Sequence, residues 1–211
     1  TLFPRLFDLT RGLTADLGET LQERRIHPRS LSALSKEELR LAENDLNADP
    51  IAMITSGSLV SVLYTLILRD IFKITPDFAL GYSLGEIGML FAMRVWDQAD
   101  AVRSALQASP LFHQQLSGPK LAVRAHWSLP ETGDGAAPVW ENHFLMAPVE
   151  RVKEALALEP RLYLTHVNTP RQVVVGGDPA AVARLVASLK CTSLKASFDF
   201  TLHCEAMRSV Y

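Results

Sequence analysis

The sequence predicts an α/β fold, and two of its features carry this prediction. Residues 78–95 pass from a short apolar run through a Gly-x-Ser-x-Gly turn into a stretch with helical spacing. In the second half of the chain, short apolar segments typical of strands alternate with two helical patterns. Strands that alternate with helices are typical of mixed α/β folds. With 211 residues and 48% apolar content, the chain can bury a substantial core.

The composition excludes several functional classes. The net charge is −2 and the lysines and arginines are scattered, so neither a nucleic acid nor a membrane surface is expected as a partner. The two cysteines, Cys191 and Cys204, form no CxxC motif, which suits a reducing cytoplasm. We predict no metal site and no permanently bound cofactor. The chain begins at Thr1 without a signal sequence, and we expect it to be part of a longer polypeptide.

Two helices are predicted from their N-terminal signals. Ser35 and Glu38 form a capping-box pattern that opens a short polar helix. Asp49, followed by Pro50, opens the next helix. Residues 51–68 carry no charge and approach the length of a membrane-spanning helix, but serines and threonines interrupt them. We therefore predict a buried central helix rather than a membrane span.

The centre of the chain predicts a strand-turn-helix unit. A strand at 77–82 leads into the turn around Ser83, and a helix then extends to about Trp96. Asp97 is predicted to cap a further helix over 99–108. This order makes the first half of the chain α/β.

A stretch rich in proline and glycine, 118–142, marks a boundary. Beyond it, strands and helices are predicted in the order β-α-β-β-α-β, at 143–147, 149–158, 161–167, 172–175, 179–189 and 192–196. This is the ferredoxin-like order. We therefore predict a large subdomain over 1–118 and 197–211, incomplete at both ends, and an inserted small subdomain over 119–196.

The turn that carries Ser83 is how a nucleophilic serine is usually presented. Its glycines tolerate the strained backbone of a sharp strand-to-helix turn. Ser83 would then lie at a helix N-terminus, where the backbone N–H of Leu84 and the helix dipole can stabilise an oxyanion. The alternative is a structural turn in which Ser83 only caps the helix.

Three motifs together resemble the malonyl-CoA:acyl carrier protein transacylase family, which loads acyl carrier proteins in fatty acid and polyketide synthases. Residues 81–86, GYSLGE, are similar to the nucleophile motif G-[HY]-S-x-G-E. Residues 167–177, VNTPRQVVVGG, are similar to the hairpin V-N-[ST]-P-x-Q-x-V-[IV]-x-G. His203, followed by the letters CEAM, falls where the family has its catalytic histidine.

The resemblance implies an α/β-hydrolase-like large subdomain and a transfer in two steps. His203 would take the proton of Ser83, whose oxygen attacks an acyl-CoA thioester to form an acyl-serine. The phosphopantetheine thiol of an acyl carrier protein would then collect the acyl group, inside a multienzyme synthase. The wording of 81–96 and 108–116 is most similar to acyltransferase domains of polyunsaturated fatty acid and heterocyst glycolipid synthases.

Departures from the family pattern affect substrate choice. Members that select malonyl groups carry an arginine at the position of Ala108, where it pairs with the free carboxylate. Arg103 lies more than one helical turn earlier and would project in another direction. Together with Tyr82, these are the predicted substrate-binding positions. Burying a carboxylate without a partner cation costs several kcal/mol of free energy, so we expect an uncharged acyl group. The family's P-G-Q-G segment, its C-terminal segment and its usual residues before His203 are not found in this chain.

Two alternatives remain open. An α/β-hydrolase thioesterase or lipase shares the Gly-x-Ser-x-Gly turn, and its triad would need Asp178 or Asp199 as the acid. A non-catalytic docking or structural domain could also retain the motif. Cys204 is expected to be a small buried apolar residue. The other five histidines are expected to be solvated or packed in the core: His27, His113, His126, His143 and His166.

Overall fold

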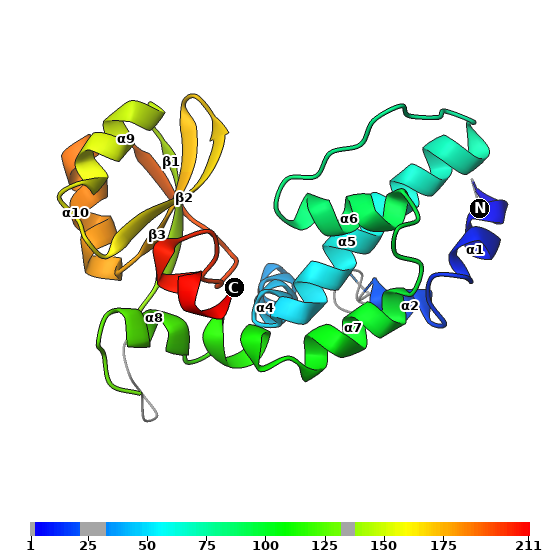
Figure 1. Ribbon diagram of the computed structural model, residues 1–211, viewed down its shortest axis with the longest axis horizontal. Coiled ribbons are helices and arrows are strands. Elements are labelled where there is room, and N and C mark those ends of the chain that lie inside the picture. The colour runs from blue at the N-terminus through cyan, green and yellow to red at the C-terminus, as the bar shows by residue number, and fades with distance from the viewer. Residues whose placement is uncertain (1–2, 22–32, 132–137) are drawn as a thin grey trace. The chain divides into compact units, whose positions relative to one another are not determined.

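The computed structural model describes residues 3–21, 33–131 and 138–211, so His27 lies outside the described residues. The chain forms two compact units, Thr1–Ser109 and Pro110–Tyr211 (Figure 1). Residues 197–211 are part of the second unit in this division. The predicted subdomain boundaries, in which this segment returns to the large subdomain, stay a prediction.

The described part of the first unit is built from helices. Their bounds are α1 Pro4–Thr10, α2 Leu17–Thr20, α4 Lys36–Asn47, α5 Pro50–Leu66, α6 Leu84–Ala92 and α7 Ala99–Ala108, with a π-helical turn Ile67–Ile71 after α5. The predicted capping box is confirmed, because the Ser35 N–H donates to the Glu38 carboxylate at 2.8 Å and the Glu38 N–H donates to Ser35 Oγ at 3.2 Å. Asp49 caps α5 as predicted, accepting from the Ala52 N–H at 2.9 Å.

Helix α5 is the buried central helix that the sequence predicts. Its side chains Leu59, Val62 and Leu66 form a core with Phe91 of α6. Together with the π-helical turn, the span Pro50–Ile71 is 22 residues long and apolar enough to cross a membrane by length and composition. Core helices meet the same two criteria, and packing against α6 accounts for the apolar composition of α5.

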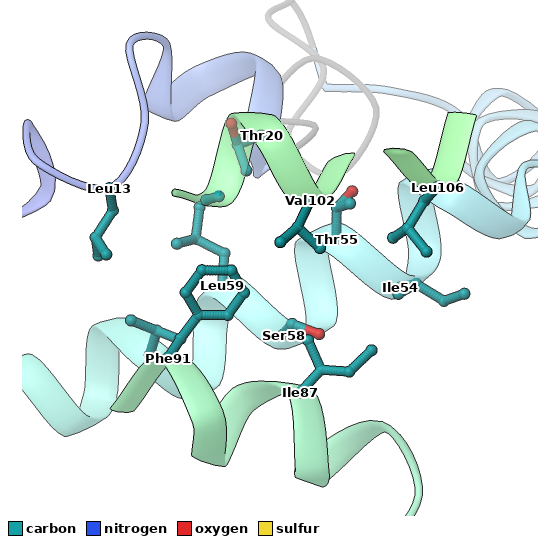
Figure 2. A pocket seen from close by; sticks show the side chains of 12 residues that line it. Leu13, Thr20, Ile54, Thr55, Ser58, Leu59, Ile87, Phe91, Val102 and Leu106 are labelled. Carbon is teal, nitrogen blue, oxygen red and sulfur yellow. The ribbon is translucent and has the colours of Figure 1, made fainter. Parts of the chain in front are cut away.

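A small cavity lies in this core, between α5, α6 and α7 (Figure 2). Its lining is mostly apolar, with Leu59, Ile87 and Val102 contributed by the three helices. Its volume is about 20 Å³, which is room for about one water molecule. Ser58 Oγ is buried beside it and has no hydrogen-bond partner among the described residues. We therefore regard the cavity as a packing feature rather than a substrate pocket.

The strand predicted at 77–82 is wrong. The structure forms no strand there, and the side chains of Phe78 and Leu80 are 92% and 88% exposed. An apolar run becomes a strand only where a neighbouring backbone supplies its hydrogen bonds. All strands among the described residues belong to the second unit, so the first unit is helical and the α/β class comes from the second.

Two helix boundaries in the first unit also differ from the prediction. The helix after Ser83 ends at Ala92 rather than near Trp96. Asp97 does not cap α7, because the N-cap residue is Gln98 and its side chain makes no capping bond. The Ala99 N–H donates instead to the Leu13 carbonyl at 2.9 Å, so a tertiary contact replaces the local cap.

The second unit follows the predicted β-α-β-β-α-β order. Its elements are β1 Glu141–Met146, α9 Val149–Leu156, β2 Leu162–Thr169, β3 Gln172–Gly177, α10 Pro179–Leu189 and β4 Thr192–Lys195. These bounds agree with the predicted ones to within two residues. The strands lie in the order β2-β3-β1-β4, and every neighbouring pair is antiparallel. The stretch 118–142 is not entirely loop, because helix α8 occupies Leu121–His126.

The two faces of this sheet are covered differently. Helices α9 and α10 pack on the face that carries Leu145, Val173 and Val175 (Figure 1). Phe144 points to the opposite face, where its ring meets that of Phe198 with centroids 6.3 Å apart. The segment that leads to His203 therefore crosses the face that α9 and α10 leave open.

Candidate active site

Ser83 lies at a strained position directly before α6. Its backbone has φ 53° and ψ −118°, and it is the N-cap residue of the helix. A positive φ at a residue other than glycine costs about 1–3 kcal/mol, and such positions gather at functional sites. The Ser83 side chain makes no capping hydrogen bond to α6. The alternative in which Ser83 serves as a helix cap is therefore not the arrangement observed.

Gly81 permits this turn because the chain folds back closely on itself. A Cβ atom on Gly81 would lie 2.4 Å from the backbone N and Cα of Glu86. The turn is closed by two backbone bonds, from the Gly85 N–H to the Tyr82 carbonyl at 3.0 Å and from the Glu86 N–H to the Ser83 carbonyl at 2.9 Å. Any side chain at position 81 would push the start of α6 away and move Ser83 with it.

A hollow on the surface of the first unit lies beside this turn. Phe78 and Leu80 line it from the extended segment, Ser61 and Thr65 from α5, and Met89 from α6. The exposed side chains of Phe78 and Leu80, from the segment predicted as a strand, therefore line this hollow.

The residues predicted to bind the oxyanion and the substrate lie in the first unit with Ser83. Leu84 is the first residue of α6, so its backbone N–H belongs to the helix end where the dipole is positive. Tyr82 is exposed, and Ala108 is an exposed residue at the last position of α7. Their roles in oxyanion and substrate binding stay predictions.

Arg103 is held in an ion pair on its own helix. Its Nη2 lies 3.4 Å from Asp100 Oδ1. The Asp100 carboxylate also accepts from the Ala15 N–H at 2.7 Å and from the Thr14 hydroxyl at 2.8 Å, and these contacts lower its pKa from the usual value. Arg103 therefore supports the attachment of α7 to the N-terminal loop, and its predicted contact with substrate stays a prediction.

His203 lies in the second unit, just before a short 3-10 helix, Glu205–Val210. Its backbone has φ 53°, so both predicted catalytic residues adopt a strained conformation. The His203 N–H donates to the Tyr211 hydroxyl at 3.4 Å. The exposed His203 ring packs against His166 of β2, with centroids 4.9 Å apart and planes at 88°.

Contacts within the second unit hold the segment that leads to His203. They are the bond from the Thr201 N–H to the Leu116 carbonyl at 2.9 Å, the bond from Asn142 Nδ2 to the Phe200 carbonyl at 2.8 Å, and the ion pair of Lys120 Nζ with Asp199 Oδ2 at 2.7 Å. Lys120 is only 4% exposed, and a buried ammonium needs such a partner. The backbone around His203 is thus fixed from two directions, by β1 and by the region of α8.

Cys204 follows His203 directly. Burial raises the pKa of the Cys204 thiol to about 11, so it stays protonated at neutral pH. Cys204 is half-buried rather than buried as expected, and it packs against two core clusters as a small apolar residue would. Both cysteines are free thiols.

Comparisons with known proteins place this geometry in context. No protein-family model matches the sequence. A polyunsaturated fatty acid synthase subunit of Thraustochytrium sp. is 27% identical over 208 residues, which is 96% of this chain and 10% of that protein. Malonyl CoA-acyl carrier protein transacylase of Synechocystis sp. is 24% identical over 172 residues, covering 75% of this chain and 52% of that protein.

A solved structure agrees with these relatives. The acyltransferase domain from the second module of the salinomycin polyketide synthase superposes with a TM-score of 0.59 and 20% identity, over 98% of this chain and 41% of that one. The chain has the fold of acyltransferase domains. Its relatives and structural neighbours are malonyl-CoA:acyl carrier protein transacylases and polyketide synthase acyltransferase domains, which confirms the predicted resemblance. The chain spans about half or less of the length of these relatives.

The two predicted catalytic residues lie in different units of the chain. Ser83 belongs to the first unit and His203 to the second, and their approach to hydrogen-bond distance stays a prediction. The two acids of the hydrolase alternative are engaged elsewhere. Asp178 caps α10 by accepting from the Ala181 N–H at 2.9 Å, and Asp199 pairs with Lys120.

His166 is the residue of this region that the sequence did not indicate. We expected it to be solvated or packed in the core, whereas its ring contacts that of His203. Among the described residues, no group of three or more His, Cys, Asp or Glu side chains is placed to hold a metal ion.

Proposed function

We propose that this chain is part of an acyltransferase, which moves an acyl group from CoA to the phosphopantetheine thiol of an acyl carrier protein. The carrier and the other domains of a fatty acid or polyketide synthase would be its partners, in the cytoplasm. In this proposal the first unit belongs to an α/β-hydrolase-like large subdomain, and the β-α-β-β-α-β sheet is an inserted ferredoxin-like small subdomain.

The single observation that carries the proposal is the backbone of Ser83. A serine that starts a helix is normally favoured there by its capping bond, but Ser83 makes no such bond and its backbone is strained. Such an arrangement is expected where the hydroxyl must be presented for reaction. The names of the relatives supply the reaction class, because they include a malonyl CoA-acyl carrier protein transacylase.

The reaction would proceed in two steps, acylation of Ser83 and transfer of the acyl group to the carrier thiol. Ser83 Oγ attacks the thioester carbonyl carbon while a ring nitrogen of His203 takes the hydroxyl proton. The C–S bond breaks, and the departing CoA sulfur receives that proton, leaving an acyl-serine ester. The carrier thiol then gives its proton to His203 and attacks the ester, and Ser83 recovers its proton as the new thioester forms. The Leu84 N–H would stabilise the oxyanion in both steps.

The acyl group in this proposal is uncharged. Ala108 offers no cation to a malonyl carboxylate, and Arg103 is already paired with Asp100. An unpaired buried carboxylate is strongly disfavoured, so acetyl-CoA or a longer neutral acyl-CoA is the expected donor.

The proposal is tested by intact-mass analysis of the complete acyltransferase domain after incubation with a mixture of acyl-CoAs. We expect a single acyl adduct on Ser83, and its transfer to an added phosphopantetheine-bearing carrier protein. Ser83→Ala should abolish the adduct and lower transfer by about 10³-fold or more. Ser104→Ala, which removes an exposed serine from α7 of the same unit, is the matched control and should leave both unchanged.

The same experiment separates the two alternatives. Release of free acid without carrier acylation would identify a hydrolase. Failure of Ser83 to react with either acyl-CoA or a fluorophosphonate probe would identify a non-catalytic domain.

A further inference from the structure

His166 reaches its position because β2 contains a β-bulge. Before the bulge, Leu164 pairs with Val175, and after it His166 pairs with Val174. Thr165 is therefore an extra residue that has no pairing partner on β3. Without this insertion His166 would oppose Val173, which is fully buried on the face packed by α9 and α10. The bulge therefore turns His166 to the opposite face of the sheet, the face that the His203 segment crosses. Bulges recur next to active sites because they re-aim a side chain in this way.

The bulged residue also holds the His166 ring. The Thr165 hydroxyl donates to the Val174 carbonyl at 3.2 Å, which uses its only hydrogen. Thr165 Oγ1 must then accept at 3.0 Å from His166 Nδ1, so that nitrogen carries the proton. The ring of His166 is thus fixed in orientation and in tautomer by the residue directly before it.

The His166 ring is kept neutral by its surroundings. Burial is the main cause that lowers its pKa from the usual value, and the neighbouring His203 lowers it further. Two imidazolium rings with centroids 4.9 Å apart would repel one another.

We propose that His166 is a positioning residue, which holds the His203 imidazole at right angles to its own ring and so limits the orientations that the proposed base can adopt. This inference rests on the proposed function, since it needs His203 to be the base. The side chain of His203 is exposed, and contact with a neighbour of defined orientation limits the rotation of its ring about χ1 and χ2. The fixed, neutral ring of His166 is this neighbour and contacts one side of the His203 ring.

The role of the Thr165 hydroxyl, which holds His166, is tested by two substitutions of Thr165 in the complete domain. Thr165→Val keeps the branched shape of the side chain and its strand preference but removes the hydroxyl that fixes His166. Thr165→Ser keeps the hydroxyl. We expect Thr165→Val to lower the acylation rate at saturating acyl-CoA by several-fold with KM unchanged, and Thr165→Ser to restore the wild-type rate.

The ring is tested by His166→Ala, with His126→Ala as the matched control in the same unit. His126 lies near Tyr163 at 6.4 Å between ring centroids and has no part in the proposed arrangement. We expect His166→Ala to lower kcat for acylation about tenfold without raising KM, because misorientation of a catalytic base slows the chemical step and not acyl-CoA binding. His126→Ala should behave as wild type. Rates are normalised to the fraction of Ser83 that a fluorophosphonate probe labels at completion, so that loss of folded protein is not counted.

Each outcome decides the matter. A wild-type rate in His166→Ala, or an effect confined to KM, would overturn the inference while leaving the acyltransferase proposal intact. If Thr165→Ser is impaired as much as Thr165→Val, the hydroxyl anchor is refuted. Failure of the proposed function has a different signature, namely wild-type enzyme that forms no acyl-Ser83 or His203→Ala that acylates at the wild-type rate.

Discussion

The side-chain amide of Asn142 donates a 2.8 Å hydrogen bond to the backbone carbonyl of Phe200, three residues before His203. Asn142 is 3% exposed and its Oδ1 accepts from Trp140 Nε1 at 2.9 Å. A Cβ on Gly176 would lie 2.4 Å from the Trp140 ring and 2.6 Å from Asn142 Oδ1. Only glycine at position 176 of β3 therefore leaves room for these two side chains. A buried polar chain in β1 therefore fixes the path of the segment that carries the predicted base.

Replacement of Asn142 by alanine should destabilise the second unit by about 2–4 kcal/mol. The substitution leaves the Trp140 N–H and the Phe200 carbonyl buried without partners, and each unsatisfied group costs about 1–3 kcal/mol. Urea unfolding followed by tryptophan fluorescence measures the change. Asn168→Ala is the control, because Asn168 is exposed and its bond to Gln172 is long at 3.4 Å. Equal, small effects of both substitutions would contradict the stabilising role of the Asn142 hydrogen bonds.

Two glycines of the nucleophile turn should respond differently to alanine. Gly81→Ala places a methyl group 2.4 Å from the backbone of Glu86, whereas nothing lies within 4 Å of a Cβ on Gly85. We expect Gly81→Ala to lower labelling of Ser83 by a fluorophosphonate probe at least tenfold, because the turn must open. Gly85→Ala should fold as well as wild type or be more stable by up to about 1 kcal/mol, since alanine favours the helix. Comparable labelling of the two variants would refute this account of the turn.

Acylation should be lost in acid if a histidine is the base. An imidazole that already carries a second proton cannot accept the proton of Ser83. In His203→Ala this acidic limb should disappear together with most of the activity. Single-turnover acylation measured across the pH range provides the test, and a variant that keeps both the limb and the rate would remove His203 from the mechanism.

Substrate preference should change with Ala108. Wild-type enzyme is expected to load acetyl in preference to malonyl, and Ala108→Arg should shift this preference toward malonyl by about one to two orders of magnitude, because a charge-assisted pair contributes about 1.5–3 kcal/mol. Direct competition between the two acyl-CoAs, followed by mass spectrometry, measures the ratio. Ala101→Arg adds the same charge at another exposed position of α7 and should not change it. If wild-type enzyme loads malonyl faster, Arg103 becomes the first residue to test as a substitute cation.

Cys204 should resist alkylation in the folded protein despite lying next to His203. With its pKa raised to about 11, the thiol is almost wholly protonated at pH 8, and the thiolate is the reactive form. Iodoacetamide at pH 8 should therefore modify Cys204 in urea but only slowly in buffer. Rapid modification of the folded protein would show that the thiol is less buried than the structure indicates.

Where local chemistry decides an element, the sequence predicted it well. The capping box at Ser35, the Asp49 cap and the Asp178 start of α10 are each made by a side chain bonding within three residues of itself, and all three are present. The strands of the second unit were also predicted, because every one of them finds a strand partner within the same unit. The strand at 77–82 failed because no described segment of the first unit offers it a strand partner, and the Asp97 cap failed because a contact from Leu13 replaced it.

The sequence by itself determined the nucleophile turn, because Gly81 permits the close backbone approach that the turn before α6 requires. It also determined the motif around His203, which resembles that of a known family. Tertiary structure alone decided which residues surround these two. The bulge at Thr165 turns His166 toward His203, and the amide of Asn142 reaches Phe200 across 58 positions of the chain. Both depend on strand register, and a shift of one residue in register reverses the face of every side chain that follows. Such a shift leaves no local pattern, so it becomes visible only when the strands are paired.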